Sequence, residues 1–252
     1  MDSIVFISGA SSGFGRACAE KFAAAGHSLI ITGRRDERLQ DLKNILEQEH
    51  KVKVLTLCFD VQDPVAVSKA VGSMSAYWQK IDILINNAGL AAGRDYFDEA
   101  LMSDWETMID TNVKGLLYVT RAILPFMTQR GKGHIINIGS IAGKEVYEKG
   151  NVYCASKHAV DALSAAMRID LLRHRIKVTA IHPGAAETEF SLVRFKGNKD
   201  QAKKIYEGYK PLAAEDIAET VFYCVNLPAH VCINDLTITP LAQANSFYVY
   251  RD

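Results

Sequence analysis

Short strand-like runs alternate with amphipathic helical segments along nearly all of the 252-residue sequence. Several of the strand-like runs carry consecutive apolar residues, as strands do when they are buried on both faces of a parallel sheet. Strands are predicted at 4–7, 29–31, 52–59, 81–85, 134–138, 177–181 and 236–239, with helices at 13–25, 38–46 and 151–172 and a further helix starting at Asp63-Pro64. This alternation predicts an α/β fold, a doubly wound seven-stranded parallel sheet with helices on both faces.

The sequence contains no Pro/Gly/Ser-rich linker and no internal repeat, so we expect residues 1–252 to form one domain. Residues 188–210 break the alternation with a charged, helix-like stretch. Insertions of this length in a compact domain are usually binding loops, and we expect a substrate loop here. A plain surface excursion is the alternative.

Composition excludes several classes of protein. The 29 Lys and Arg balance the 29 Asp and Glu, so the basic surface of a nucleic-acid-binding protein is not expected. No apolar run approaches the roughly 20 residues of a membrane span, and no export signal is evident, so we expect a cytoplasmic protein. The 5 cysteines show no ligand spacing, which favours reduced thiols and no metal.

A glycine-rich turn lies between the first predicted strand and the first predicted helix. Glycines allow the backbone to approach a pyrophosphate, and the helix N-terminus that follows offers free N–H groups and the positive end of its dipole. Glycine clusters also occur in ordinary turns, but this position favours dinucleotide binding. The candidate contacts are Gly9, Ser11, Ser12, Gly13, Phe14 and Gly15.

The spacing of this turn is G-x-x-x-G-x-G, and further motifs follow it in order: Asp60, Asn86-Asn87-Ala88-Gly89, Asn112, Ser140, Tyr153-x-x-x-Lys157 and Pro183-Gly184 leading to Thr188. In these motifs the sequence resembles the short-chain dehydrogenases/reductases over essentially its whole length. The resemblance implies a nicotinamide cofactor, with contacts from Asp60, Val61, Asn87, Ala88, Gly89, Pro183, Gly184 and Thr188. Ser8 replaces the threonine usual in the family and keeps the hydroxyl.

The end of the second predicted strand indicates which cofactor is bound. NAD-binding units place an acidic residue about 20 positions after the glycines, where it bonds the ribose 2′-OH. Gly33 stands at that position, followed by Arg34 and Arg35. Guanidinium groups bind phosphate in a bidentate manner. A carboxylate at position 33 would repel the 2′-phosphate of NADP, and Gly33 carries none. The sequence therefore predicts NADP, although both arginines are also acceptable as surface charges beside a helix.

Tyr153 and Lys157 are expected on one face of the helix at 151–172. A second copy of this spacing, Tyr206-x-x-x-Lys210, shows that the motif alone is not specific. Only Tyr153 is preceded by a serine, Ser140, just past a predicted strand at the sheet edge where such folds build their sites. We expect Tyr153 to be catalytic and Tyr206 to be structural.

The residue types suit alcohol oxidation and carbonyl reduction. A phenol becomes a useful base when a nearby ammonium and an oxidised nicotinamide stabilise its anion, and Ser140 would hydrogen-bond the substrate oxygen. The resemblance further implies that Lys157 holds the nicotinamide ribose and that Asn112 relays protons to Lys157 through water. A turn-forming role for Ser140 and a helix-interior role for Asn112 are the alternatives.

Longer stretches, including 32–39, 86–91, 189–198 and 227–231, resemble the NADP-dependent 3-hydroxy acid dehydrogenase subgroup. That resemblance implies small substrates such as serine, allo-threonine or malonic semialdehyde, and a homotetramer. A substrate carboxylate needs a cation, for which Arg194 is the first candidate and Lys144 the second. Ala185-Ala186 replaces bulkier residues of relatives and leaves substrate size open.

Three functional hypotheses follow. The first is a 3-hydroxy acid dehydrogenase that uses NADP. The second is a general NADPH-dependent carbonyl reductase acting on substrates without a carboxylate. The third is a non-catalytic module that senses NADP(H), which the presence of Ser140, Tyr153 and Lys157 disfavours.

Overall fold

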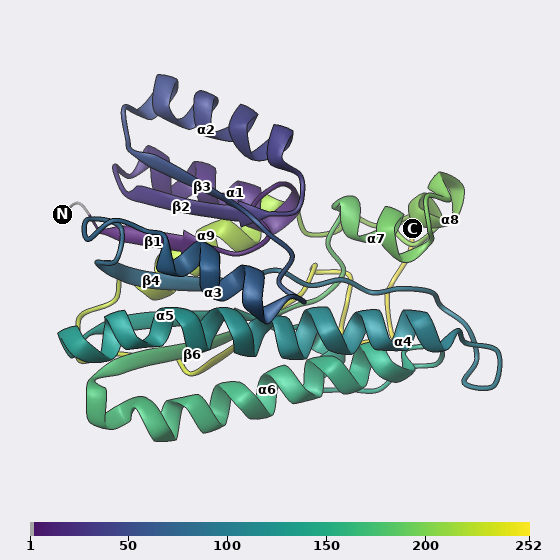
Figure 1. Cartoon of the computed structure of the whole chain (residues 1–252). Coiled ribbons are helices and arrows are strands. Elements are labelled where there is room, and N and C mark those ends of the chain that lie inside the picture. Colours follow the sequence, from purple (N-terminus) through teal and green to yellow (C-terminus); the bar gives the residue numbers. More distant parts are fainter. Residues whose placement is uncertain (1–2) are drawn as a thin grey trace.

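Seven parallel strands form one sheet in the computed structural model, which describes residues 3–252 (Figure 1). Their spatial order is β3-β2-β1-β4-β5-β6-β7. Strands β2 and β3 are added on one side of β1 and strands β4 to β7 on the other, so the order of strand addition reverses between β1 and β4. The strands are β1 (Ile4–Ile7), β2 (Ser28–Gly33), β3 (Val54–Cys58), β4 (Ile81–Asn86), β5 (Gly133–Ile138), β6 (Ile176–Pro183) and β7 (Asp235–Ile238). The predicted seven-stranded Rossmann-type domain is confirmed, with strand bounds that differ from the predicted ones by at most two residues.

Helices cover both faces of the sheet. The long helices are α1 (Gly13–Ala24), α2 (Asp36–His50), α3 (Pro64–Gly72), α4 (Met102–Ile109), α5 (Leu116–Arg130), α6 (Asn151–Leu171) and α9 (Ala214–Val225). Shorter elements are the π-helix η1 (Asp110–Gly115) and the 3₁₀ turns η2 (Ile141–Gly143) and η3 (Leu172–His174). Residues of α1, α2 and α9 pack on one face, and residues of α3, α5 and α6 pack on the other.

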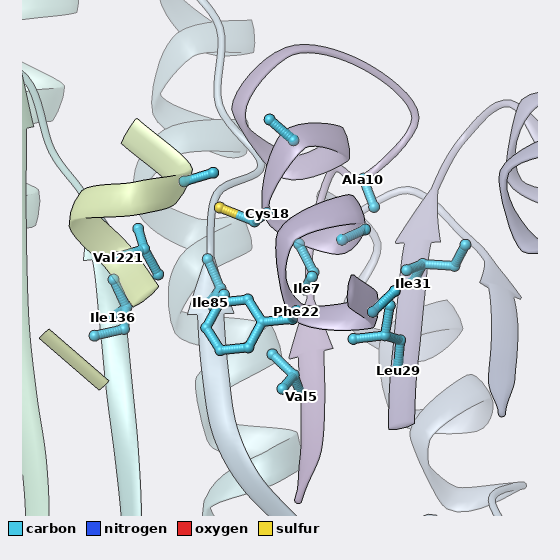
Figure 2. Close-up of a cluster of buried hydrophobic side chains, with 14 of the residues drawn as sticks. Val5, Ile7, Ala10, Cys18, Phe22, Leu29, Ile31, Ile85, Ile136 and Val221 are labelled. Atoms are coloured by element: carbon cyan, nitrogen blue, oxygen red, sulfur yellow. The ribbon is translucent and has the colours of Figure 1, made fainter. Parts of the chain in front are cut away.

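The alternation of side chains along each strand produces these two cores. On β1, Val5 and Ile7 face α1 and α9, where they join Phe22 and Val221 in the cluster that Figure 2 shows. Phe6 points to the opposite face, with α3 and α5. All five side chains are fully buried, and burying each contributes about 1.5–3 kcal/mol. A core on both faces holds the strand ends, and the turns that follow them, in fixed positions.

The chain between β6 and α9 departs from the layered pattern. It forms two short helices, α7 (Glu189–Arg194) and α8 (Lys199–Lys204), which lie beyond one end of the sheet in Figure 1 (green). They fall within the predicted insertion at 188–210, whose role as a substrate loop stays a prediction. In the described part of the chain, no helix combines the length and apolar character needed to cross a bilayer.

Candidate active site

A cleft of about 460 Å³ lies along the carboxyl ends of the strands. Such volumes suit small-molecule and cofactor sites. Nearly all the predicted site residues line it: Gly9, Ser11, Ser12, Gly13, Phe14, Arg34, Arg35, Asp60, Val61, Asn87, Ala88, Gly89, Ser140, Tyr153, Lys157, Pro183, Gly184, Thr188 and Arg194. Gly15, Asn112 and Lys144 do not line the cleft.

At one end of the cleft the start of α1 is open to an anion. Its N-cap residue, Ser12, makes no side-chain capping bond, and the first turn carries no acidic residue, so the terminal N–H groups stay available. Gly9 and Gly13 have φ angles of +69° and +52°, which favour glycine. A Cβ on Gly15 would lie 2.4 Å from the carbonyl oxygen of Gly9, so Gly15 serves the packing of helix against turn. This cradle fits a pyrophosphate.

Ser8 and Asn87 join the turn after β1 to the turn after β4. The Ser8 hydroxyl accepts hydrogen bonds from the backbone N–H groups of Asn87 and Ala88, each at 3.0 Å. The Asn87 amide donates to the carbonyl oxygens of Ser8 and Gly9, both at 3.0 Å. These bonds cross the point where the strand order reverses, so they hold the cradle beside the rest of the cleft.

Two arginines line the cleft after β2. Arg34 lies 3.5 Å from the Asp60 carboxylate, and Arg35 donates to the hydroxyls of Ser11 and Ser12, each at 2.9 Å. A Cβ added at Gly33 would lie 3.5 Å from the Ser11 hydroxyl, and the three atoms nearest to it include no carboxylate oxygen. A region rich in guanidinium groups and without a carboxylate at Gly33 fits the 2′-phosphate of NADP.

Tyr153, in the first turn of α6, is only 7% exposed and faces Ser140 across the cleft. Ser140 hydrogen-bonds the Tyr153 hydroxyl, and its own hydroxyl accepts from the Ala142 N–H at 3.1 Å. Burial raises the pKa of Tyr153 above its ordinary value, while Ser140 and the charge of Arg194 act to lower it. Tyr153 therefore holds its proton at neutral pH, as a proton donor must.

Lys157 is one helical turn further along α6, as predicted. Its ammonium group donates to the Ile138 carbonyl at 2.9 Å, and burial lowers its pKa to about 8. Gly89 packs close by, since a Cβ there would lie 3.6 Å from Lys157 Nζ.

Asn112 lies in the π-helix η1, a type of helix that often occurs at functional sites. Its amide donates to the Leu90 carbonyl at 2.8 Å and to the Ser156 hydroxyl at 3.0 Å, and its oxygen accepts from the Leu90 N–H at 2.8 Å. These contacts clamp the chain that follows Gly89. A proton relay through Asn112 stays a prediction.

Arg194 of α7 reaches the catalytic centre from the other side of the cleft. It is 8% exposed, and its guanidinium carbon lies 5.6 Å from the centre of the Tyr153 ring. It donates to the Tyr147 hydroxyl at 3.0 Å. Within residues 3–252, no carboxylate lies within 4.0 Å of its guanidinium nitrogens. A buried cation without an anionic partner beside the acid/base residue fits an anionic ligand.

Lys144, the second candidate cation, lies outside the cleft. Its ammonium group bonds the carboxylates of Asp161 and Asp235, at 2.9 and 2.7 Å. Tyr206 lies in the cleft wall, where its hydroxyl donates to the Ala186 carbonyl at 2.7 Å and contacts Ser191 at 2.5 Å. Thr188 lines the cleft and caps α7, accepting from the Phe190 N–H at 3.2 Å.

Several residues of the cleft were missed by sequence reasoning. Tyr147 precedes α6 and holds Arg194, while Gln243 and Ser246 reach the cleft from the chain after β7. Glu189 pairs with Arg35 at 3.1 Å and with Arg38 at 2.8 Å. No motif marks any of them, because their positions depend on segments brought together by folding.

The fold and this site define a nucleotide-dependent oxidoreductase architecture, and the chain belongs to the short-chain dehydrogenase family, whose sequence profile matches residues 3–198.

Individual relatives are similar over nearly full length. The chain is 49% identical over 242 residues to the NADP-dependent 3-hydroxy acid dehydrogenase of Salmonella typhi, covering 96% of each protein. It is 46% identical over 254 residues to sulfoacetaldehyde reductase 2 of Chromohalobacter salexigens, covering 100% of each. Among solved structures, the closed form of serine dehydrogenase complexed with NADP⁺ is 47% identical with a TM-score of 0.92, covering 99% of this chain and 100% of that one.

Proposed function

We propose that the protein is an NADP-dependent oxidoreductase that moves hydride between NADP(H) and a small 3-hydroxy acid or its carbonyl form. The observation that carries the substrate class is Arg194, a buried cation 5.6 Å from the Tyr153 ring with no carboxylate partner in the described chain. The substrates given in the names of the similar dehydrogenases and of the sulfoacetaldehyde reductase have one feature in common, a hydroxyl or carbonyl group close to an acidic group. An uncharged carbonyl substrate would leave the charge of Arg194 without a partner.

In this proposal each residue of the site has a separate role in binding or catalysis. The glycine turn and the start of α1 would hold the phosphates of the cofactor, and when bound NADPH would supply the hydride for reduction and NADP⁺ would accept it in oxidation. Arg194 holds the acid group of the substrate, which places the reacting carbon beside Tyr153 and Ser140. Ser140 donates a hydrogen bond to the substrate oxygen and stabilises the charge that develops there.

Tyr153 moves the proton. In the direction of reduction its hydroxyl protonates the substrate oxygen, and in the direction of oxidation its phenolate takes that proton back. The positive charge of Lys157 favours the phenolate, and with a pKa of about 8 Lys157 is mostly charged at neutral pH. Asn112 orients the segment at Leu90 that borders the site.

A substrate panel tests the proposal. Purified protein is assayed by absorbance of the reduced cofactor, with NADP⁺ and NAD⁺ against serine, allo-threonine and 3-hydroxypropionate. The reverse reaction is assayed with NADPH and NADH against malonic semialdehyde and sulfoacetaldehyde. We expect NADP-dependent turnover of substrates with an acid group and only slow turnover of uncharged carbonyl compounds. Equal turnover of uncharged ketones would favour a general carbonyl reductase, and cofactor binding without turnover would favour a sensing module.

We further propose that the protein is a cytoplasmic homotetramer. The exposed apolar residues Leu101, Met102 and Leu117 on and beside α4 and α5 support association. Sedimentation equilibrium of the purified protein tests the assembly, and a monomer would contradict it.

A further inference from the structure

A cluster of charged side chains lies behind the catalytic serine, outside the cleft. At its centre is His182 of β6, which is 0% exposed. Its Nε2 lies 3.1 Å from the carboxylate of Asp235 and 3.5 Å from that of Asp161. Lys144 bonds both carboxylates at 2.7 and 2.9 Å, so the chain itself supplies the positive charge that these carboxylates require.

The other side of the His182 ring touches the backbone that carries the catalytic hydroxyl. His182 Nδ1 lies 3.2 Å from the carbonyl oxygen of Ser140. A Cβ on Gly139 would lie only 2.5 Å from the same nitrogen, so the ring packs directly against residues 139 and 140. This loop has few ways to move while His182 stays in place.

We propose that His182, packed between the Asp235 and Asp161 carboxylates and the turn at Gly139, is a positioning residue that fixes the backbone of Ser140 and thereby the hydroxyl facing Tyr153. The proposal rests on the assigned role of Ser140 in the proposed function. It also gives Lys144 a role: by bonding both carboxylates, the ammonium group keeps the cluster, and therefore the ring, in one arrangement.

The proton on His182 determines which of its contacts is a hydrogen bond. A carbonyl and a carboxylate both only accept, so each contact needs a proton on the nitrogen that faces it. Burial lowers the pKa of His182, and the nearby carboxylates of Asp235 and Asp161 only partly oppose this while Lys144 adds to it. The positioning role requires that Nδ1 donate to the Ser140 carbonyl, and the contact between Nε2 and Asp235 is a hydrogen bond only while the ring carries a second proton.

Two variants separate these contacts. In His182→Asn, the amide nitrogen takes the place of Nδ1 and still donates to the Ser140 carbonyl. In His182→Gln, the amide reaches the place of Nε2, toward Asp235, and the donor to Ser140 is lost. Both variants leave a similar neutral amide in the same buried position, so each is the matched control for the other.

We expect kcat of His182→Gln to fall roughly ten-fold while His182→Asn stays within about two-fold of the wild type, because small displacements of a reacting group cost large factors in rate. The KM for NADPH should stay unchanged in both, since His182 does not line the cleft. A merely structural role predicts a different result: kcat would fall in both variants in step with their melting temperatures.

Hydrogen exchange provides a second measurement that does not depend on turnover. The N–H groups of Ala142 and Gly143 donate to the Ser140 side chain and carbonyl, at 3.1 and 2.8 Å. They should exchange several-fold faster in His182→Gln than in His182→Asn. Equal exchange in the two variants would overturn the positioning role. An inactive wild type with this difference in exchange would instead refute only the proposed function.

Discussion

The guanidinium carbon of Arg194 lies 5.6 Å from the centre of the Tyr153 ring, although 41 residues separate them in the sequence. The two come from different elements, α7 and α6. Arg194 also contacts Tyr147. It donates a hydrogen bond to the Tyr147 hydroxyl, and its guanidinium carbon lies 5.6 Å from the centre of the Tyr147 ring. In the proposed function, this arrangement places the cation that would bind the substrate's acid group within reach of the residue that would transfer the proton.

Replacing Arg194 by alanine should raise the KM for acidic substrates roughly 10- to 100-fold, the loss expected for hydrogen bonds to a charged group worth about 1.5–3 kcal/mol. Turnover of an uncharged aldehyde should change little. The exposed Arg173→Ala variant is the control, and steady-state kinetics with both substrate types is the measurement. An equal loss for both substrates would show that Arg194 acts only by supporting Tyr147 and Gly93, whose carbonyl accepts a hydrogen bond from Arg194 Nε at 3.4 Å.

Tyr153→Phe should lower kcat by roughly 10³-fold, because it removes the only proton that the residue transfers and leaves the ring packing intact. Binding of NADPH, followed by fluorescence titration, should remain close to that of the wild type.

Tyr206→Phe is the matched control for the loss of a tyrosine hydroxyl. Its hydroxyl bonds the Ala186 carbonyl in the cleft wall, so we expect a loss of stability of about 1 kcal/mol with the chemical step retained. A loss of kcat as large as that of Tyr153→Phe would contradict the assignment of the acid/base residue.

Gly33→Asp should reverse cofactor preference. The residue lies at the end of β2 beside Arg34, and the nearest atoms to an added Cβ are 3.5 Å or more away, so the side chain fits. Its carboxylate would repel the 2′-phosphate and accept a hydrogen bond from a ribose hydroxyl. We expect the ratio of kcat/KM for NADP over NAD to fall about 100-fold. Gly33→Ser, which adds size without charge, should change that ratio far less, and an equal change would refute the electrostatic explanation.

Lys157→Met should abolish turnover and yet stabilise the fold. The folded-state pKa of Lys157 is about 8, against an ordinary value of 10.5, because its charge is buried. Below pH 8 the wild type therefore bears the full penalty, roughly 3 kcal/mol for a shift of this size. Between pH 8 and 10.5 the unfolded chain binds the proton more tightly than the folded one, so the wild type gains stability as the pH rises.

Urea unfolding of wild type and Lys157→Met at several pH values measures this effect. The variant's advantage should be largest below pH 8 and vanish near pH 10.5. A constant difference across this range would show that the charge of Lys157 carries no penalty. Lys43→Met, at a half-buried position of α2 whose ammonium group lies 4.0 Å from the Glu47 carboxylate, should shift stability far less at any pH.

Much of the fold and of the cofactor site could be predicted from the sequence, because the signals are local. Strands buried on both faces require consecutive apolar residues, as at 4–7, and a phosphate cradle requires glycine where φ is positive, as at Gly9 and Gly13. Tyr153 and Lys157 are one helical turn apart, so the helix alone brings them to one side.

The substrate end was less predictable. The sequence placed Arg194 before Lys144 as the candidate cation, but either was equally acceptable as a solvated surface charge. Folding separated them: α7 carries Arg194 into the cleft, while Lys144 meets carboxylates from α6 and β7. His182 showed no pairing in the sequence and lies fully buried behind Ser140.

Local sequence patterns were enough to predict the succession of strands and helices along the chain, the glycine cradle, the lack of a carboxylate at Gly33 and the pairing of Tyr153 with Lys157. Each of these depends on residues within a few positions of one another, whose geometry follows from backbone periodicity. Folding in three dimensions was needed to establish that Arg194 faces Tyr153, that Lys144 does not reach the cleft, and that His182 contacts the Ser140 backbone. These contacts join segments that are distant in the chain. The partner of a charged or polar side chain depends on which opposite charge or hydrogen-bond acceptor folding brings within a few ångströms of it.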